Sequence, residues 1–205
     1  RRLRRQQQHP EALHDLSTAL QETTHLVIDQ STRSEIEQTV CDTLVDTDGY
    51  DCAQLGKVDG RTESVTVQAS AGVCEDVALS NPDSMLGETV VRQAIWTQEI
   101  QATTSIQEDP AFDWKRDTEQ THTEQAVAAV PISYAGTVYS ILSVYTDRLG
   151  AFGTEELEIL SQIGAVVGHA IAATERTQAL MSNELIEVEI KIPQIFPQKT
   201  PPPSD

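Results

Sequence analysis

A pair of adjoining apolar segments constrains the fold of this chain more than any other feature. Residues 126–133 are nearly all apolar, Tyr134-Ala135-Gly136 has the composition of a tight turn, and residues 137–145 carry apolar side chains at both alternating sets of positions. Strands with apolar residues on both faces are covered on two sides. The segment therefore predicts a central antiparallel hairpin with a packing layer on each face of its sheet.

Further strands and helices are predicted from similar patterns. Residues 50–58 and 62–70 surround Asp59-Gly60, which is typical of a hairpin turn. Helices are predicted where apolar residues recur three and four positions apart behind a helix-starting residue. They start at Pro10, Ser34, Asp83 or Ser84, and Thr154, and a short strand is predicted over 100–102. The predicted fold class is α+β, with helices packed on an antiparallel sheet of five or six strands.

The chain length of 205 residues fits one domain of ordinary size. Apolar residues alternate with polar ones from Ile186 to Ile192, which indicates a strand, and prolines follow. We expect residues 1–10 to be the end of a linker, 11–182 the domain, 183–192 the start of a following segment, and 193–205 a disordered tail or an artificial end of the chain.

The charge of the chain excludes two classes of partner. It has 14 Lys and Arg against 32 Asp and Glu, a net charge of -18. Nucleic acids and anionic membranes are bound through Lys and Arg, so we expect neither partner for this segment. The acidic surface favours adaptation to molar salt, in which self-repulsion is screened. No run of 18 apolar residues and no signal-peptide pattern is present, so a cytoplasmic location is expected.

The three cysteines, Cys41, Cys52 and Cys74, have 10 and 21 residues between them. They lack the close pairs of a zinc site or of a thioredoxin-type dithiol. We therefore expect all three to be reduced and to pack as small apolar residues.

The hairpin is specific enough to be compared with known families. Its sequence from Ala128 to Tyr145, followed by Ala151-Phe152 and Glu155-Glu156-Leu157, resembles a GAF domain. It is similar in particular to the GAF domains of haloarchaeal regulators related to the bacterio-opsin activator, over about residues 13–192. The position of Ser140 is commonly Gly in similar hairpins. The resemblance implies a non-catalytic sensor domain of a transcription regulator, with any DNA contact made by another segment.

The resemblance also implies a small-molecule site, although no cofactor can be named. The signatures of cyclic-nucleotide-binding and bilin-binding GAF domains are absent. Residues 103–125 form a long polar segment whose aromatic residues could close a pocket over the sheet or plug it instead. The candidate ligand-binding residues are Cys52, Phe112, Trp114 and Tyr139.

Two other functions are left open. One is a structural dimerisation spacer whose core is filled by its own side chains. The other is an enzyme, because free methionine sulfoxide reductases are GAF domains with three cysteines. Two sulfurs brought together near a pocket would favour the enzyme. The chain has no phosphate-binding Gly-Lys-Ser/Thr loop, Gly-x-Ser-x-Gly elbow or His-Glu-x-x-His motif.

The first and last helices carry apolar stripes that predict a parallel homodimer. Small glycines on the last helix would let two helices approach closely; the alternative is that both helices only cover their own sheet. The predicted seam consists of Leu13, Leu16, Leu20, Leu160, Gly164, Val167 and Ile171.

Overall fold

The computed structural model describes residues 2–30, 32–47, 49–59, 64–74, 90–103, 126–148 and 150–183. In chain order these residues form helices α1 (Arg2–Asp29) and α2 (Arg33–Asp46), strands β1 (Cys52–Asp59) and β2 (Ser64–Gly72), helix α3 (Val90–Thr97), strands β3 (Gln101–Thr103), β4 (Ala126–Tyr134) and β5 (Thr137–Thr146), and helix α5 (Thr154–Asn183).

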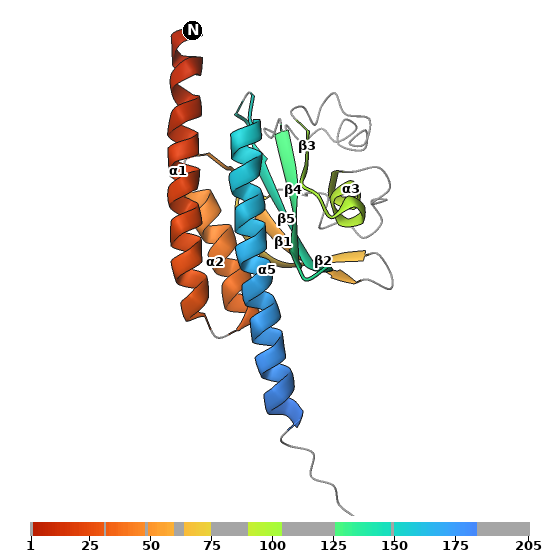
Figure 1. Cartoon of the computed structure of the whole chain (residues 1–205). Helices are drawn as coiled ribbons and strands as arrows, with labels where there is room; N and C mark the ends of the chain where they lie inside the picture. Colours follow the sequence, from red (N-terminus) through yellow and green to blue (C-terminus); the bar gives the residue numbers. More distant parts are fainter. Residues whose placement is uncertain are drawn as a thin grey trace, which may run out of the picture.

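The strands form one sheet in the order β2-β1-β5-β4-β3, and all neighbouring strands are antiparallel. Helices α1, α2 and α5 lie on one side of the sheet, which we call the helix side, and α3 lies on the other, the α3 side (Figure 1). The predicted α+β class, with a five-stranded antiparallel sheet, is confirmed.

The two hairpins form where the sequence predicts them. Ala135 and Gly136 connect β4 to β5 with φ angles of 51° and 80°. A two-residue turn with positive φ at both positions matches the right-handed twist of the strands. The pairing of β1 with β2 shifts by one residue between Leu55 and Gly56, so their register is not continuous. The predicted short third strand is present as β3.

Helices α2 and α5 also agree with the sequence. Thr32 caps α2: its hydroxyl accepts from the Glu35 amide at 3.3 Å, and its own amide donates to the Glu35 carboxylate at 3.0 Å. This reciprocal arrangement is a capping box. Helix α5 begins at Thr154, as predicted. The described part of α3 begins at Val90, and its predicted start lies outside the described residues.

The start of α1 was predicted wrongly. The helix begins at Arg2 rather than at Pro10, which therefore lies inside it. A proline removes one backbone hydrogen bond but does not forbid a helix. The Arg and Gln residues that precede Pro10 have high helix propensity, so the helix extends through them.

Both faces of the sheet are covered by a separate apolar cluster. The helix-side cluster contains Leu55 of β1, Leu142 of β5 and residues of α1, α2 and α5. The α3-side cluster contains Val90, Val91 and Ala94 of α3 with inward residues of three strands. The prediction that the central hairpin is buried on two sides is confirmed.

Helix α5 carries the most apolar long segment. In the described part of the chain, Thr154–Met181 alone is long and apolar enough to cross a membrane by length and composition. Its buried residues, such as Leu160 and Ile163, belong to the domain core, and the helix packs against β4 and α1. A helix that covers a sheet has this composition too, so its packing explains its hydropathy.

Candidate functional site

Arg33, in the first turn of α2, joins three elements on the helix side. Its Nε donates to Glu37 at 2.7 Å, and its Nη1 pairs with Glu175 of α5. Its Nη2 donates to the Tyr139 carbonyl at 3.0 Å and to Ser140 Oγ at 2.7 Å. Ser140 Oγ donates to Glu37 at 3.2 Å. The hydroxyl at this commonly glycine position therefore completes a charged cluster that links β5, α2 and α5.

A second charged cluster holds the start of α5. Glu156 accepts from the Tyr50 hydroxyl at 2.8 Å and from the Phe152 amide at 2.8 Å, and it pairs with Arg148. The Tyr50 and Phe152 rings stack with centroids 6.1 Å apart. Burial, followed by the neighbouring Glu156 carboxylate, raises the pKa of the Tyr50 phenol. The helix side thus pairs its buried carboxylates with cations and hydroxyls.

Most of the predicted dimer seam is buried inside the domain. Helices α1 and α5 pack on each other, and α5 packs on the sheet of the same domain. These contacts cover the apolar stripes without a second molecule. Leu13 and Leu20 are half-buried. The seam residues that are at most 1% exposed are Leu16, Leu160, Val167 and Ile171.

Gly164 and Gly168 of α5 face β4 of the same domain. A Cβ at Gly164 would lie 2.9 Å from Val130 Cγ1, and a Cβ at Gly168 would lie 2.3 Å from the Ser133 carbonyl oxygen. These glycines therefore allow the helix to approach its own sheet closely. Gly164 and the four buried seam residues are thus corrected from partner contacts to intramolecular packing.

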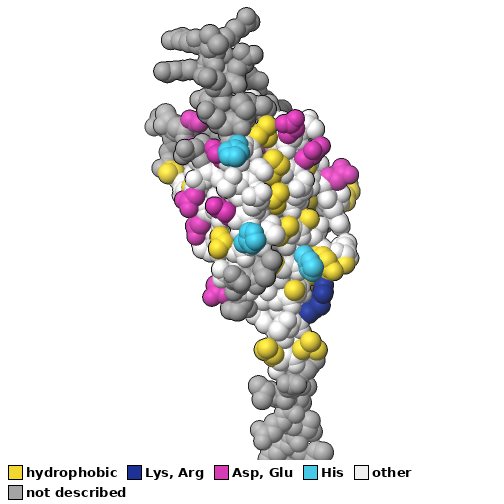
Figure 2. Space-filling model, turned by 60° about the vertical axis from the view of Figure 1, so that its left-hand side comes forward, with side chains coloured by type: hydrophobic (Ala, Val, Ile, Leu, Met, Phe, Trp, Pro, Cys, Tyr) yellow, Lys and Arg dark blue, Asp and Glu magenta, His cyan; other side chains and the backbone are white. Residues whose placement is uncertain are grey.

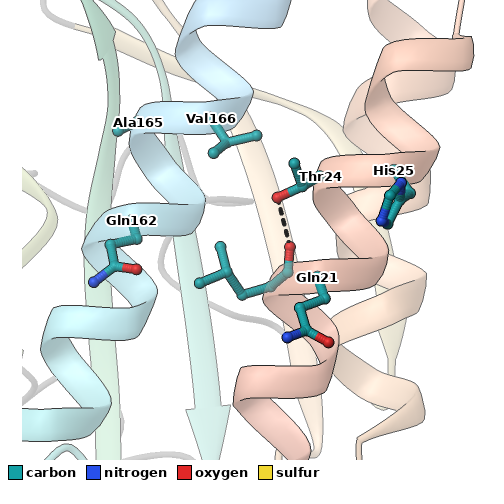
Figure 3. A pocket seen from close by; sticks show the side chains of 7 residues that line it. Gln21, Thr24, His25, Gln162, Ala165 and Val166 are labelled. Atoms are coloured by element: carbon teal, nitrogen blue, oxygen red, sulfur yellow. Dashed lines mark hydrogen bonds between the residues drawn. The ribbon is translucent and has the colours of Figure 1, made fainter.

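A groove runs between α1 and α5 on the outer surface of the helix side. Figure 2 shows apolar side chains following one another along this surface. In Figure 3, Thr24 of α1 and Val166 of α5 point toward one another across the groove, and the Thr24 hydroxyl donates to the Leu20 carbonyl at 2.7 Å. The groove is lined by Leu20, Gln21, Thr24, His25, Gln162, Ala165 and Val166.

On the α3 side, two directly opposed strand residues are buried with polar atoms that have no partner in the described structure. Gln54 of β1 and Ser143 of β5 are 3% and 0% exposed and stand directly opposite each other in the antiparallel ladder. Directly opposed residues have Cβ atoms roughly 4.5–5.5 Å apart. In the described structure, neither Gln54 Oε1 nor Ser143 Oγ has a hydrogen-bond partner. We call these two side chains the polar pair.

The surroundings of the polar pair are apolar. On one flank of the polar pair the ladder places Cys52 opposite Tyr145, and on the other flank it places Gly56 opposite Ile141. Cys52, Tyr145 and Ile141 all belong to the α3-side cluster. Unpartnered atoms elsewhere in the described residues include Thr23 Oγ1 and Arg148 Nε, but they are not opposed in this way. A buried polar group without a partner is destabilising, so two such groups side by side indicate a place where a ligand can bind.

The expectation that all cysteines are reduced is contradicted for two of them. Cys52 and Cys74 form a disulfide with their Cα atoms 5.2 Å apart. Cys52 opens β1, and Cys74 follows β2 of the same hairpin, so strand pairing brings together residues 22 positions apart. Cys41 is free and buried, as predicted, and burial raises the pKa of its thiol to about 12.

The other predicted ligand-binding residues are not gathered at one place in the described structure. Cys52 belongs to the α3-side cluster, whereas half-buried Tyr139 packs against the helix-side cluster. Phe112 and Trp114 lie outside the described residues, as do the segments 184–192 and 193–205. The sequence did not single out Gln54; the only signal was a polar residue two positions after Cys52, on the same face of the predicted strand.

Metal binding is not supported by the described residues, since they contain no group of three or more His, Cys, Asp or Glu side chains that could hold an ion.

The arrangement is that of a small α+β domain with paired buried charges on the helix side and a buried polar pair on the opposite side of its sheet. The GAF domain family model matches residues 30–172, and the chain belongs to the GAF domain family. The described fold and the family assignment therefore agree.

Proteins that resemble this chain in sequence or in fold carry different names. A Haloferax volcanii protein named "Putative transcriptional regulator" is 31% identical over 192 residues, which is 89% of this chain and 29% of that protein. The chain thus spans less than a third of the relative's length. The GAF domain of a Coxiella burnetii phosphoenolpyruvate-protein phosphotransferase has a TM-score of 0.67 at 16% identity, covering 82% of this chain and 98% of that chain.

An enzyme shares the fold as well. The free methionine-R-sulfoxide reductase of Neisseria meningitidis, in complex with its substrate, has a TM-score of 0.66 at 14% identity, covering 79% of this chain and 91% of that chain. At these identities the solved structures establish the fold alone.

Proposed function

We propose that the chain is a sensor domain that binds a small uncharged molecule on the α3 side of its sheet, within a cytoplasmic transcription regulator. The polar pair carries this proposal, because the buried Gln54 Oε1 can accept a hydrogen bond from a ligand and the buried Ser143 Oγ can donate or accept one. The described residues of the α3-side cluster carry no charge. Burying an ion there without a counter-ion would be costly, which favours a neutral molecule with an amide-like edge.

The Arg33 cluster offers a route from this face to the end of α5. Ser140 lies three residues before Ser143 on β5, and its hydroxyl contacts Arg33, which pairs with Glu175 near the end of α5. A shift of β5 on ligand binding would therefore alter the contact that holds the outer half of α5. Ligand binding should change the rate of amide hydrogen exchange in residues 175–183 of the wild type, and it should leave that rate unchanged in Arg33→Met.

Native mass spectrometry tests the proposed site directly. The wild type should retain a small molecule from its host, or from a metabolite extract, when it is prepared in concentrated salt. The double variant Gln54→Leu, Ser143→Ala should lose it, whereas Thr66→Ala, an exposed change on β2, should keep it. A wild type that binds nothing from the extract would contradict the proposal.

A homodimer over the α1–α5 groove is supported by a different part of the surface. With most of the earlier seam buried, the residues that α1 and α5 can offer to a second copy include those lining the groove and Leu26, which is 43% exposed. Two identical grooves can cover each other about a two-fold axis. Light scattering in molar KCl should give a dimer for the wild type and for Trp96→Glu, which changes the α3 side, but a monomer for Ala165→Glu, Val166→Glu. A monomeric wild type would exclude this interface.

The enzyme alternative is favoured by one observation, the Cys52–Cys74 disulfide beside the polar pair. Methionine sulfoxide reduction by thiols would leave such a disulfide as its product. Turnover of free methionine-R-sulfoxide with dithiothreitol decides the matter. Activity that is lost in Cys52→Ala and in Cys74→Ser would replace the sensor proposal, and no activity in the wild type would exclude the enzyme.

A further inference from the structure

The disulfide has one hidden and one accessible end. Cys52 is fully buried in the α3-side cluster, whereas Cys74 is half-buried and follows Val73, whose side chain is 67% exposed. Thiol–disulfide exchange begins when an external thiolate reaches one of the two sulfurs. In this geometry that sulfur belongs to Cys74.

The backbone around Gly72 is built to place Cys74 over Cys52. Gly72 has a φ of +79°, and a Cβ at this position would lie 2.2 Å from the Asp51 carbonyl oxygen. The same carbonyl accepts a hydrogen bond from the Val73 amide at 2.9 Å. The left-handed glycine therefore bends the chain at the end of β2. The Val73 side chain is exposed there, and Cys74 lies within disulfide distance of Cys52.

We propose that Cys52–Cys74 is a reversible exchange site for an external dithiol, attacked at Cys74, and that its redox state changes the α3 side of the sheet. The first thiolate of the dithiol bonds to Cys74 Sγ and breaks the Cys52–Cys74 bond, and Cys52 takes up a proton. The second thiol then attacks the mixed disulfide, so the partner leaves as a disulfide and Cys74 is released as a thiol. Two electrons pass from the dithiol to the pair, and the reverse steps restore the bond.

The third cysteine takes no part in this exchange. Cys41 lies on α2 in the helix-side cluster, on the opposite face of the sheet. Desolvation by burial keeps its thiol protonated, with a pKa of about 12, and only the thiolate is a nucleophile. The pair on the α3 side can therefore change its redox state without exchange to a third position.

Exchange at this pair would reach the proposed ligand site through β1. Cys52 and Gln54 are two residues apart on the same face of one strand, which places them roughly 7 Å apart. Releasing Cys52 from Cys74 would free the end of the hairpin next to the polar pair. This second part of the proposal rests on the proposed ligand site, whereas the exchange chemistry does not.

The exchange is tested in Cys41→Ala, which retains only the pair. Protein purified without reductant should contain no free thiol, and folded protein incubated with dithiothreitol in molar KCl should contain two. The rate should rise linearly with dithiothreitol and stay constant in low urea. A rate that is independent of dithiothreitol and rises with urea would mean that reduction needs unfolding, and the proposal would fail.

Matched single-cysteine variants test the point of attack. In the Cys41→Ala background, Cys52→Ser leaves Cys74 alone and Cys74→Ser leaves Cys52 alone. Oxidised glutathione should form a mixed disulfide with the first variant at least tenfold faster, as read from the added mass. Equal rates, or faster reaction of Cys52, would overturn the assignment.

The coupling to the ligand site is read separately. Native mass spectrometry of the oxidised and the reduced Cys41→Ala protein, each mixed with the metabolite extract, should show at least a threefold difference in the bound fraction. Equal binding would overturn the coupling while leaving the exchange site in place. No binding in either form would refute the ligand site itself, and the thiol counts would still decide the exchange chemistry.

Discussion

The two sides of the sheet differ in how the buried serines of β5 are bonded. On the helix side, Arg33 and Glu37 contact Ser140, and Arg148 and Glu156 contact each other. On the α3 side, Gln54 Oε1 and Ser143 Oγ of the polar pair have no hydrogen-bond partner in the described structure. A disulfide closes the open end of the β1–β2 hairpin. The charged side chains of the helix side therefore fix the contacts between its helices and β5, whereas the polar pair on the α3 side has unused hydrogen-bonding capacity.

Removing a charge from the helix side should have the largest effect. Glu156→Gln would leave the Arg148 guanidinium, whose side chain is 13% exposed, without its counter-ion. Breaking a buried pair in this way costs about 3–5 kcal/mol of unfolding free energy. Urea unfolding in molar KCl measures it, with the exposed neighbouring change Glu155→Gln as control. Equal midpoints for the two variants would show that this cluster does not hold α5.

Removing the disulfide on the α3 side should have the second-largest effect on the unfolding free energy. Its cysteines are 22 positions apart, and closing a loop of this length stabilises a fold by about 3 kcal/mol. Oxidised wild type should therefore exceed Cys74→Ser by about that amount, and adding dithiothreitol should remove most of the difference. If oxidised wild type and variant unfold at the same urea concentration, the bond contributes nothing to stability.

Alkaline pH should lower the unfolding free energy through Cys41, which is buried on the helix side. Burial raises the pKa of Cys41 from 9.0 to about 12, so between these values the unfolded chain loses a proton that the folded chain keeps. Stability present below pH 9 is thus lost as the pH rises, by about 1.4 kcal/mol per unit. Cys41→Ala should lack this slope in unfolding experiments between pH 9 and 10. Parallel curves for wild type and variant would mean that the thiol is not protected.

The smallest changes in unfolding free energy are expected for two serine substitutions, and they should have opposite signs on the two sides of the sheet. Ser143→Ala removes an unpartnered hydroxyl and should raise the unfolding free energy of the ligand-free protein by about 1 kcal/mol. Ser140→Ala, three residues away on the same strand, removes a hydroxyl bonded to Arg33 and Glu37 and should lower it by about 1–2 kcal/mol. A loss in both variants would indicate that Ser143 has a partner.

Local patterns in the sequence were sufficient for the hairpins but not for the site. The turn at Ala135-Gly136 and the alternation around it are read within a few residues, so β4 and β5 were predicted correctly. The polar pair and the disulfide depend on which residues of β1 stand opposite β5 and β2. That register is set by tertiary packing, and the cysteine spacing alone gave no sign of it.

The seam prediction was inaccurate for a related reason. An apolar stripe on a helix does not specify whether the surface that covers it belongs to the same chain or to another. Gly168 fits closely against the Ser133 backbone, so the small residues that suggested helix–helix contact serve the contact of α5 with β4. Which neighbour a glycine admits is a property of the folded domain.

The length of α5 turns this close contact into a fulcrum. The helix has 30 residues and spans about 45 Å, and its outer part extends well beyond the sheet (Figure 1). Between Gly168, where helix and strand backbones meet, and Asn183 lies a lever arm of about 22 Å. A tilt of about 10° at the fulcrum would displace Asn183 by roughly 4 Å, with the Arg33–Glu175 contact acting on the arm between them. A strand movement too small to disturb the core would thus move Asn183 by a distance comparable to the spacing between neighbouring strands.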